Sequence, residues 1–186
     1  MPCELSSRPT FKPQLESLET RDLPSTAGIA LFMDVQTIQQ GVQAMQAQAN
    51  AASNTFVQFG KDDHALIVNG VSGTTLQPLY TDFVKLGGEI QAVRFLNSQV
   101  QAELQGFQQA VFAVASDGDS SDQTLALFAY LQVNGGLGSL FPGGSGSGSL
   151  ASQAQSALNQ VNKIASATQT PSGDTLFMTI DQRLNS

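Results

Sequence analysis

The sequence predicts an all-α protein, an antiparallel helical bundle built on two long helices at about 27–59 and 76–116 with two or three shorter ones. Two observations carry this prediction. Apolar residues recur at helical spacing along two long stretches of the chain, and cap and turn residues separate the further amphipathic stretches that follow. At 186 residues, the chain is long enough to bury a sizeable core as one domain.

The first apolar stripe begins after Pro24, where Ser25 or Thr26 can cap a helix that starts near Ala27. A helix over 27–59 would be about 50 Å long. The spacings between its apolar residues alternate between four and three, which is the signature of one apolar helix face. These residues are Leu31, Val35, Ile38, Val42, Met45, Ala49, Ala52, Phe56 and Phe59.

A second stripe repeats the same spacing and, joined to the first through residues 60–78, favours an antiparallel hairpin whose stripes face one another. Gly87 and Gly88 lie inside it and indicate either a kink or a close helix crossing. The members of the stripe are Leu79, Phe83, Leu86, Ile90, Val93, Asn97, Val100, Leu104, Phe107, Val111 and Val114.

Asn97 is the polar member of the second stripe. A buried amide at such a position can fix the register or the partner, because misaligned pairing leaves its donors and acceptors unsatisfied. Alternatively, Asn97 bonds a nearby backbone carbonyl or lies at the edge of the stripe.

The connector at 61–78 has two interpretations. Residues 66–68 before Asn69-Gly70 could form a short strand that enters a turn, or a last helical turn with Gly70 as its C-cap. We expect the helical turn, because a strand in a helical protein would lack a partner.

Two further helices follow. Ser120 and Gln123 match a capping box that starts a third helix, and a Gly/Ser-rich loop at 134–149 precedes a fourth helix that runs to about Thr168. Residues 174–184 carry Leu176, Phe177, Ile180 and Leu184 and are expected to form a short final helix, although an extended segment at 175–184 remains open. We treat 26–186 as one helical domain.

Residues 1–25 differ from the rest, because four prolines make regular structure there unfavourable. Within 15–25, the stretch LESLETRDLPS resembles the LEPR-XLL motif of exported and surface-attached bacterial proteins, planctomycete ones among them. Thr20 and Pro24 depart from that motif. The resemblance implies a location outside the cell or on its surface, with a cytoplasmic location as the alternative. Alternatively, the segment is a flexible amphipathic tail or a single helical turn that ends at Pro24. We treat 1–25 as a flexible leader or targeting segment. The residues that match are Leu18, Glu19, Arg21, Leu23 and Ser25.

Composition narrows the range of functions. Charged residues make up 12% of the chain and its net charge is -7, which argues against a nucleic-acid groove, since that would need a stripe of Lys and Arg. A neutral polar surface tolerates close packing against a neighbour. Cys3 is the only cysteine, so an intramolecular disulfide is impossible. We expect no membrane span, because no apolar run approaches about 20 residues.

Few residues suggest chemistry. His64 is the only histidine and follows Asp62 and Asp63, but a lone loop histidine is more often solvated than catalytic. One histidine also excludes a ferritin-like metal site. We therefore expect neither catalytic nor cofactor-binding residues. Three carboxylates are weak candidates for a metal site, although helix capping explains them without an ion. They are Asp117, Asp119 and Asp122.

The leading interpretation is a non-enzymatic protein whose Gln/Ala-rich helices serve self-association or contact with another protein. An alternative is a helical bundle that encloses a small apolar ligand of unknown identity. An enzyme with a site assembled from dispersed Asp, Ser and Gln is the least favoured of the three. The phenylalanines that could line a ligand site are Phe83, Phe95, Phe107, Phe112 and Phe128.

Overall fold

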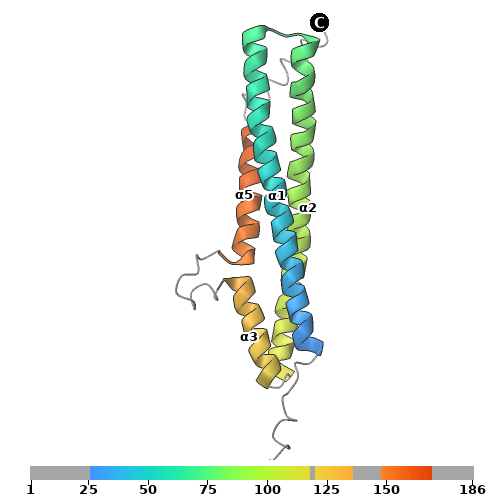
Figure 1. The fold of residues 1–186 in the computed structure, drawn as a ribbon, viewed down its shortest axis with the longest axis vertical. Coiled ribbons are helices and arrows are strands. Elements are labelled where there is room, and N and C mark those ends of the chain that lie inside the picture. Colours follow the sequence, from blue (N-terminus) through green and yellow to red (C-terminus); the bar gives the residue numbers. More distant parts are fainter. Residues whose placement is uncertain (1–25, 118–119, 136–147, 169–186) are drawn as a thin grey trace, which may run out of the picture.

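The computed structural model describes residues 26–117, 120–135 and 148–168. These residues form the four helices α1 (Thr26–Asn69), α2 (Gly73–Asp117), α3 (Ser120–Asn134) and α5 (Leu150–Thr168). The two long helices pack antiparallel, and α3 and α5 lie along them (Figure 1). The predicted all-α bundle on two long helices is confirmed. The leader at 1–25 and the predicted final helix at 174–184 fall outside the described residues.

Helix α1 is longer than predicted and continues ten residues beyond Phe59, to Asn69. The predicted connector at 61–78 is therefore wrong in extent, whereas the helical interpretation of residues 66–68 is confirmed. Leu66 explains the difference. It lies seven residues after Phe59, so it stays on the same face, and both side chains are 8% exposed.

A short turn separates the long helices. Gly70 has a φ of 79°, the left-handed conformation that ends helices and that glycine adopts without steric cost. Ser72 then caps α2 reciprocally: the Thr75 amide donates to the Ser72 hydroxyl (3.3 Å), and the Ser72 amide donates to the Thr75 hydroxyl (2.9 Å). This cap starts α2 at Gly73, three residues before the predicted start.

Most members of the predicted stripes form the core, but Phe83 of the second stripe is exposed and Asn97, Val111 and Val114 are half-buried. Every member of the first stripe is buried except Phe56, which packs against the core while partly exposed. The two long helices approach closely at Gly41, where an added Cβ would lie 2.7 Å from Cγ2 of Val100. Of the two alternatives for Gly87 and Gly88, a kink or a close crossing, the crossing is wrong, because both glycines are exposed and an added Cβ would meet nothing within 4 Å.

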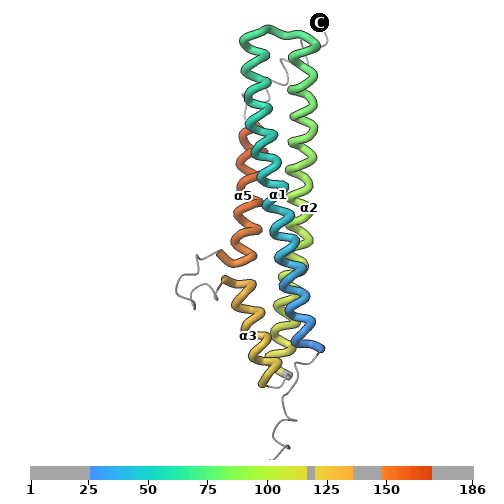
Figure 2. The backbone as a smooth tube through the Cα atoms, in the orientation of Figure 1, coloured from blue at the N-terminus to red at the C-terminus, as the bar shows by residue number. Residues whose placement is uncertain are grey.

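Helices α3 and α5 form a third column beside the long pair, one following the other (Figure 2). Both run in the direction of α1: Asp122 of α3 lies beside Gly28, and further along Gln46 donates to Gln153 of α5 (Nε2–Oε1, 3.2 Å). Ser149 caps α5 by accepting a hydrogen bond from the Ser152 amide (3.1 Å). Residues 136–147, most of the predicted Gly/Ser-rich loop, lie outside the described ranges.

The end of the α1–α2 hairpin extends beyond α5 (Figure 1), and we call this part, residues 60–87, the tip. A small second core holds it together, formed by Phe59, Leu66 and Leu79. The Phe83 ring lies 6.5 Å from that of Phe59. None of the helices in the described ranges combines the length and the apolar character of a membrane span.

Candidate functional site

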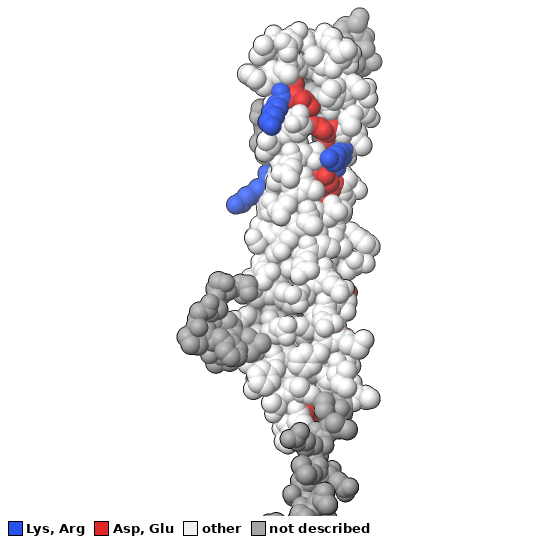
Figure 3. Space-filling view, in the orientation of Figure 1, with Lys and Arg blue, Asp and Glu red and all other residues white. Residues whose placement is uncertain are grey.

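Charged side chains gather at and near the tip on the face shown in Figure 3, and most of the face below them carries no charge. The bundle therefore has two surfaces that differ in charge. One is a group of carboxylates at the tip, and the other is an uncharged, partly apolar face along the lower part of α2.

The carboxylates at the tip come from both long helices. Asp62 of α1 accepts a hydrogen bond from Gln58 (Nε2–Oδ1, 3.0 Å), and its carboxylate lies near enough to Asp82 of α2 to affect the pKa of Asp82. Glu89 lies two turns further along α2, 4.0 Å from the Lys85 ammonium. One oxygen each of Asp82 and Glu89 is inaccessible to water and has no hydrogen-bond partner.

Burial raises the pKa of Asp82 above its ordinary value, and the negative charge of the neighbouring Asp62 carboxylate raises it further. Lys85 acts in the opposite direction, and Glu89 adds to the repulsion. Because the pKa of Asp82 is raised by folding, the ionised form of Asp82 is less favourable in the folded chain than in the unfolded chain. At neutral pH, Asp82 therefore lowers the stability of the tip.

This arrangement predicts how stability depends on pH. Because the pKa of Asp82 is raised on folding, its stabilising contribution is full below the ordinary value of 3.8 and is lost as the pH rises through the folded-state pKa. We expect Asp82→Asn to raise the urea midpoint at about pH 7 and to flatten its dependence between about pH 4 and pH 7. Asp34→Asn, at an exposed position of α1, is the control. Equal profiles for the two variants would contradict the assignment.

Sequence reasoning did not identify the carboxylate pair. Asp62 and Asp82 are 20 residues apart, and only the register of the hairpin brings them together. A signal was nevertheless present, because both lie ten residues from Ser72 in the turn. Glu89 lies off the predicted apolar stripe of α2, yet its side chain is only 12% exposed.

The weak metal candidates do not form a group in the described residues, where no cluster of three or more His, Cys, Asp or Glu could hold an ion. Asp119 and the side chain of Asp117 lie outside the described part of the chain. Asp122 is 5% exposed, in the first turn of α3 and against the first turn of α1. The positive ends of both helix dipoles stabilise a carboxylate at this place, which agrees with the helix-capping alternative.

Asn97 lies on the inner side of α2, half-buried. Its Oδ1 is inaccessible to water and accepts no hydrogen bond. An unsatisfied buried carbonyl costs about 1–3 kcal/mol, so Asn97 lowers the stability of the folded chain at this position. His64, by contrast, is exposed in the last part of α1.

The five phenylalanines proposed as a ligand lining do not enclose a cavity, and this part of the prediction is wrong. Phe107 is a core residue at 1% exposed. The others lie at the surface: Phe83 is 36% exposed, Phe128 46%, Phe95 63% and Phe112 75%.

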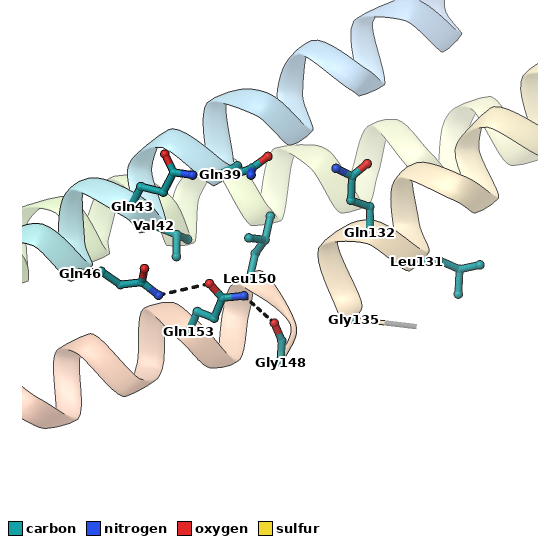
Figure 4. Close-up of a pocket in the computed structure, with 10 residues that line it drawn as sticks. All are labelled: Gln39, Val42, Gln43, Gln46, Leu131, Gln132, Gly135, Gly148, Leu150 and Gln153. Atoms are coloured by element: carbon teal, nitrogen blue, oxygen red, sulfur yellow. Dashed lines mark hydrogen bonds between the residues drawn. The ribbon is translucent and has the colours of Figure 1, made fainter. Parts of the chain in front are cut away.

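A pocket of about 380 Å³ lies between α1, α3 and α5, and Figure 4 shows that glutamines from all three helices surround it. Two of its amides are already engaged, because Gln46 donates to Gln153 and Gln153 donates to the Gly148 carbonyl (2.7 Å). The other residues of the lining are Gly, Val and Leu. This lining offers hydrogen bonds but no group that titrates near neutral pH.

The uncharged surface is the outer face of α2, which points away from the buried stripe. Arg94 and Glu103 flank it: the Arg94 guanidinium donates to Asn162 of α5 (3.2 Å), and Glu103 is half-buried on the side of α1. The residues of this face are all exposed. They are Gln91, Phe95, Ser98, Ala102, Gly106, Gln109, Phe112 and Ala113.

No protein-family model, curated protein or solved structure significantly matches the chain.

Proposed function

We propose that the chain is a non-enzymatic helical protein that self-associates, and that a second copy binds to the outer face of α2. One observation carries this proposal: the face is continuous, fully exposed and free of charge, and it bears Phe95 and Phe112, which are 63% and 75% exposed. Exposed aromatic residues in a surface without charge are typical of protein contacts rather than of a solvated helix face.

The face also permits another helix to come close. Ala102 and Gly106 lie one turn apart at its middle, and an added Cβ at Gly106 would meet nothing within 4 Å. Small residues allow the backbones of two helices to approach. A shallow hollow of about 400 Å³ beside Phe112, lined also by Gln105, Gln108 and Gln109, offers space for a side chain of the partner.

The order of residues along the face favours a second copy over an unrelated partner. Phe95 precedes Leu104 by nine residues and Phe112 follows it by eight, while Ala102 and Gly106 lie two residues to either side. A copy related by a twofold axis at the level of Leu104 would run antiparallel. It would then place Phe95 against the partner's Phe112, and Ala102 against the partner's Gly106.

The size of the face sets the expected affinity. From Gln91 to Ala113 it is about 33 Å long and about 10 Å wide, which gives roughly 330 Å² per copy. Stable interfaces bury about 800 Å² per partner. We therefore expect a weak dimer that dissociates at micromolar or higher concentration.

Self-association is tested by sedimentation of the full chain over a concentration series. We expect Ala102→Glu to weaken dimerisation at least about tenfold, because it brings two like charges together at the twofold axis. Ala47→Glu introduces the same charge on the exposed side of α1 and should leave dimerisation unchanged. A wild-type chain that stays monomeric at every concentration would overturn the proposal, as would equal effects of the two variants.

We further propose that the protein is exported or attached to the cell surface, on the strength of the motif at 18–25. Fractionation of producing cells, followed by N-terminal sequencing, tests this location. Protein in the extracellular or surface fraction supports the proposal, whether or not the leader has been removed. An intact chain confined to the cytosol refutes it.

A further inference from the structure

Helix α5 packs in the groove between α1 and α2, and both long helices continue past its end as the tip (Figure 1). Two side-chain contacts mark the walls of this groove: Gln160 donates to Ser53 of α1 (2.7 Å), and Arg94 of α2 donates to Asn162 (3.2 Å). In helices packed at heptad spacing, residues seven and fourteen positions further along keep the same orientation. On α1 these positions are Gly60 and Ile67, and on α2 they are Gly87 and Tyr80.

We call these four residues the tip strip, and another helix could pack against them. Ile67 and Tyr80 lie on different helices and are 68% and 65% exposed, so the strip leaves one large apolar and one aromatic side chain uncovered. Gly60 and Gly87 lie between them and α5, and an added Cβ at either glycine would meet nothing within 4 Å. The strip is therefore apolar at its far end and open at its near end.

The chain itself supplies an occupant of the right size. Helix α5 ends at Thr168 inside the groove, and eighteen residues follow it (169–186). Among them, 174–184 carry apolar residues at helical spacing, and as a helix this segment would be about 16 Å long. From Gly60 to Asn69, α1 extends about 15 Å beyond the level of α5. The apolar residues of the segment are Leu176, Phe177, Ile180 and Leu184.

We propose that residues 174–184 dock on the tip strip as a helix that continues the column of α3 and α5. The tip would then be a bundle of three helices instead of a pair. The tether favours this occupant over a second copy. A segment joined to α5 by only five residues (169–173) has an effective concentration in the millimolar range, whereas another molecule must be present at that concentration to compete. The inference is independent of the dimer proposed for α2.

The test compares two neighbouring residues of almost equal exposure. Ile67 is 68% exposed on the strip, and Val68 is 67% exposed but points about 100° away from it. We expect Ile67→Ser to lower the melting temperature of the full chain by about 4 °C or more, and Val68→Ser to lower it by less than about 1 °C. In a chain shortened to end at Thr168, the two substitutions should have equal effects, because the docked segment is gone.

Three outcomes would overturn the proposal. They are equal shifts in the full chain, a difference that persists after the shortening, and a difference that grows with protein concentration, since the last would identify a second copy as the occupant. Gly87→Leu and Gly88→Leu provide an independent pair. Only the change at Gly87 obstructs the strip, so it alone should weaken protection of Ile180 and Leu184 amides from hydrogen exchange in the full chain.

Discussion

Replacing Phe107 with Ala should lower the free energy of unfolding by about 3–5 kcal/mol, the usual cost of removing a buried phenyl ring. Phe107 is 1% exposed and is the largest of the fully buried side chains in the described residues. It lies in the main core, where α2 packs against its neighbours. Its loss removes apolar contact and leaves a cavity that rigid helices cannot close. Urea unfolding followed by circular dichroism at 222 nm measures the change.

Phe112→Ala is the matched control, because the same residue type lies five positions further along the same helix and is 75% exposed. We expect it to change stability by no more than about 0.5 kcal/mol at a concentration at which the protein is monomeric. If the two variants lost similar stability, the assignment of Phe107 to the core and of Phe112 to the surface would be contradicted.

The second large effect is expected at Gly41. A Cβ there would lie 2.7 Å from Cγ2 of Val100, so Gly41→Val must push α1 away from α2 or force a strained rotamer. Overpacking of this kind costs about 1–3 kcal/mol. The same substitution at Gly88, where a Cβ meets nothing within 4 Å, should be neutral or slightly stabilising because Val favours helix over Gly.

A double variant identifies the cause. Val100→Ala removes the methyl group that obstructs position 41, so the loss from Gly41→Val should be smaller in that background than in the wild-type chain. Strict additivity, measured by the same urea titrations, would mean that the cost at Gly41 arises elsewhere.

The periodicity of the sequence was enough to predict most of the core. Phe107 falls on the predicted second stripe, and the structure buries it, whereas Phe95 and Phe112 fall off the stripe, and the structure exposes them. The proposed ligand lining failed because it grouped phenylalanines by type and ignored this difference. Apolar spacing predicts which helix face points inward. Phe83 is the exception among these residues, because it lies on the stripe and is still 36% exposed.

The length of α1 was harder to predict, because Gly60 and the charged residues after it resemble the end of a helix. Tertiary packing in the hairpin outweighs this local signal. Helix α1 continues because Leu66 is then buried against Leu79 of α2. The pair of Asp62 and Asp82 was missed for a related reason. Their contact depends on the register of two helices, which no local pattern contains.

The third column consists of two separate helices, α3 and α5, whereas α1 is one continuous helix. Insertions should therefore have different effects in the two places. Adding one residue inside α1 would turn every later side chain of that helix by about 100° relative to its neighbours. Adding residues between Gly135 and Gly148 would leave both α3 and α5 in place, since each has its own contacts with α1 and α2. We therefore expect insertions between Gly135 and Gly148, including a foreign peptide, to leave the packing of the four helices unchanged.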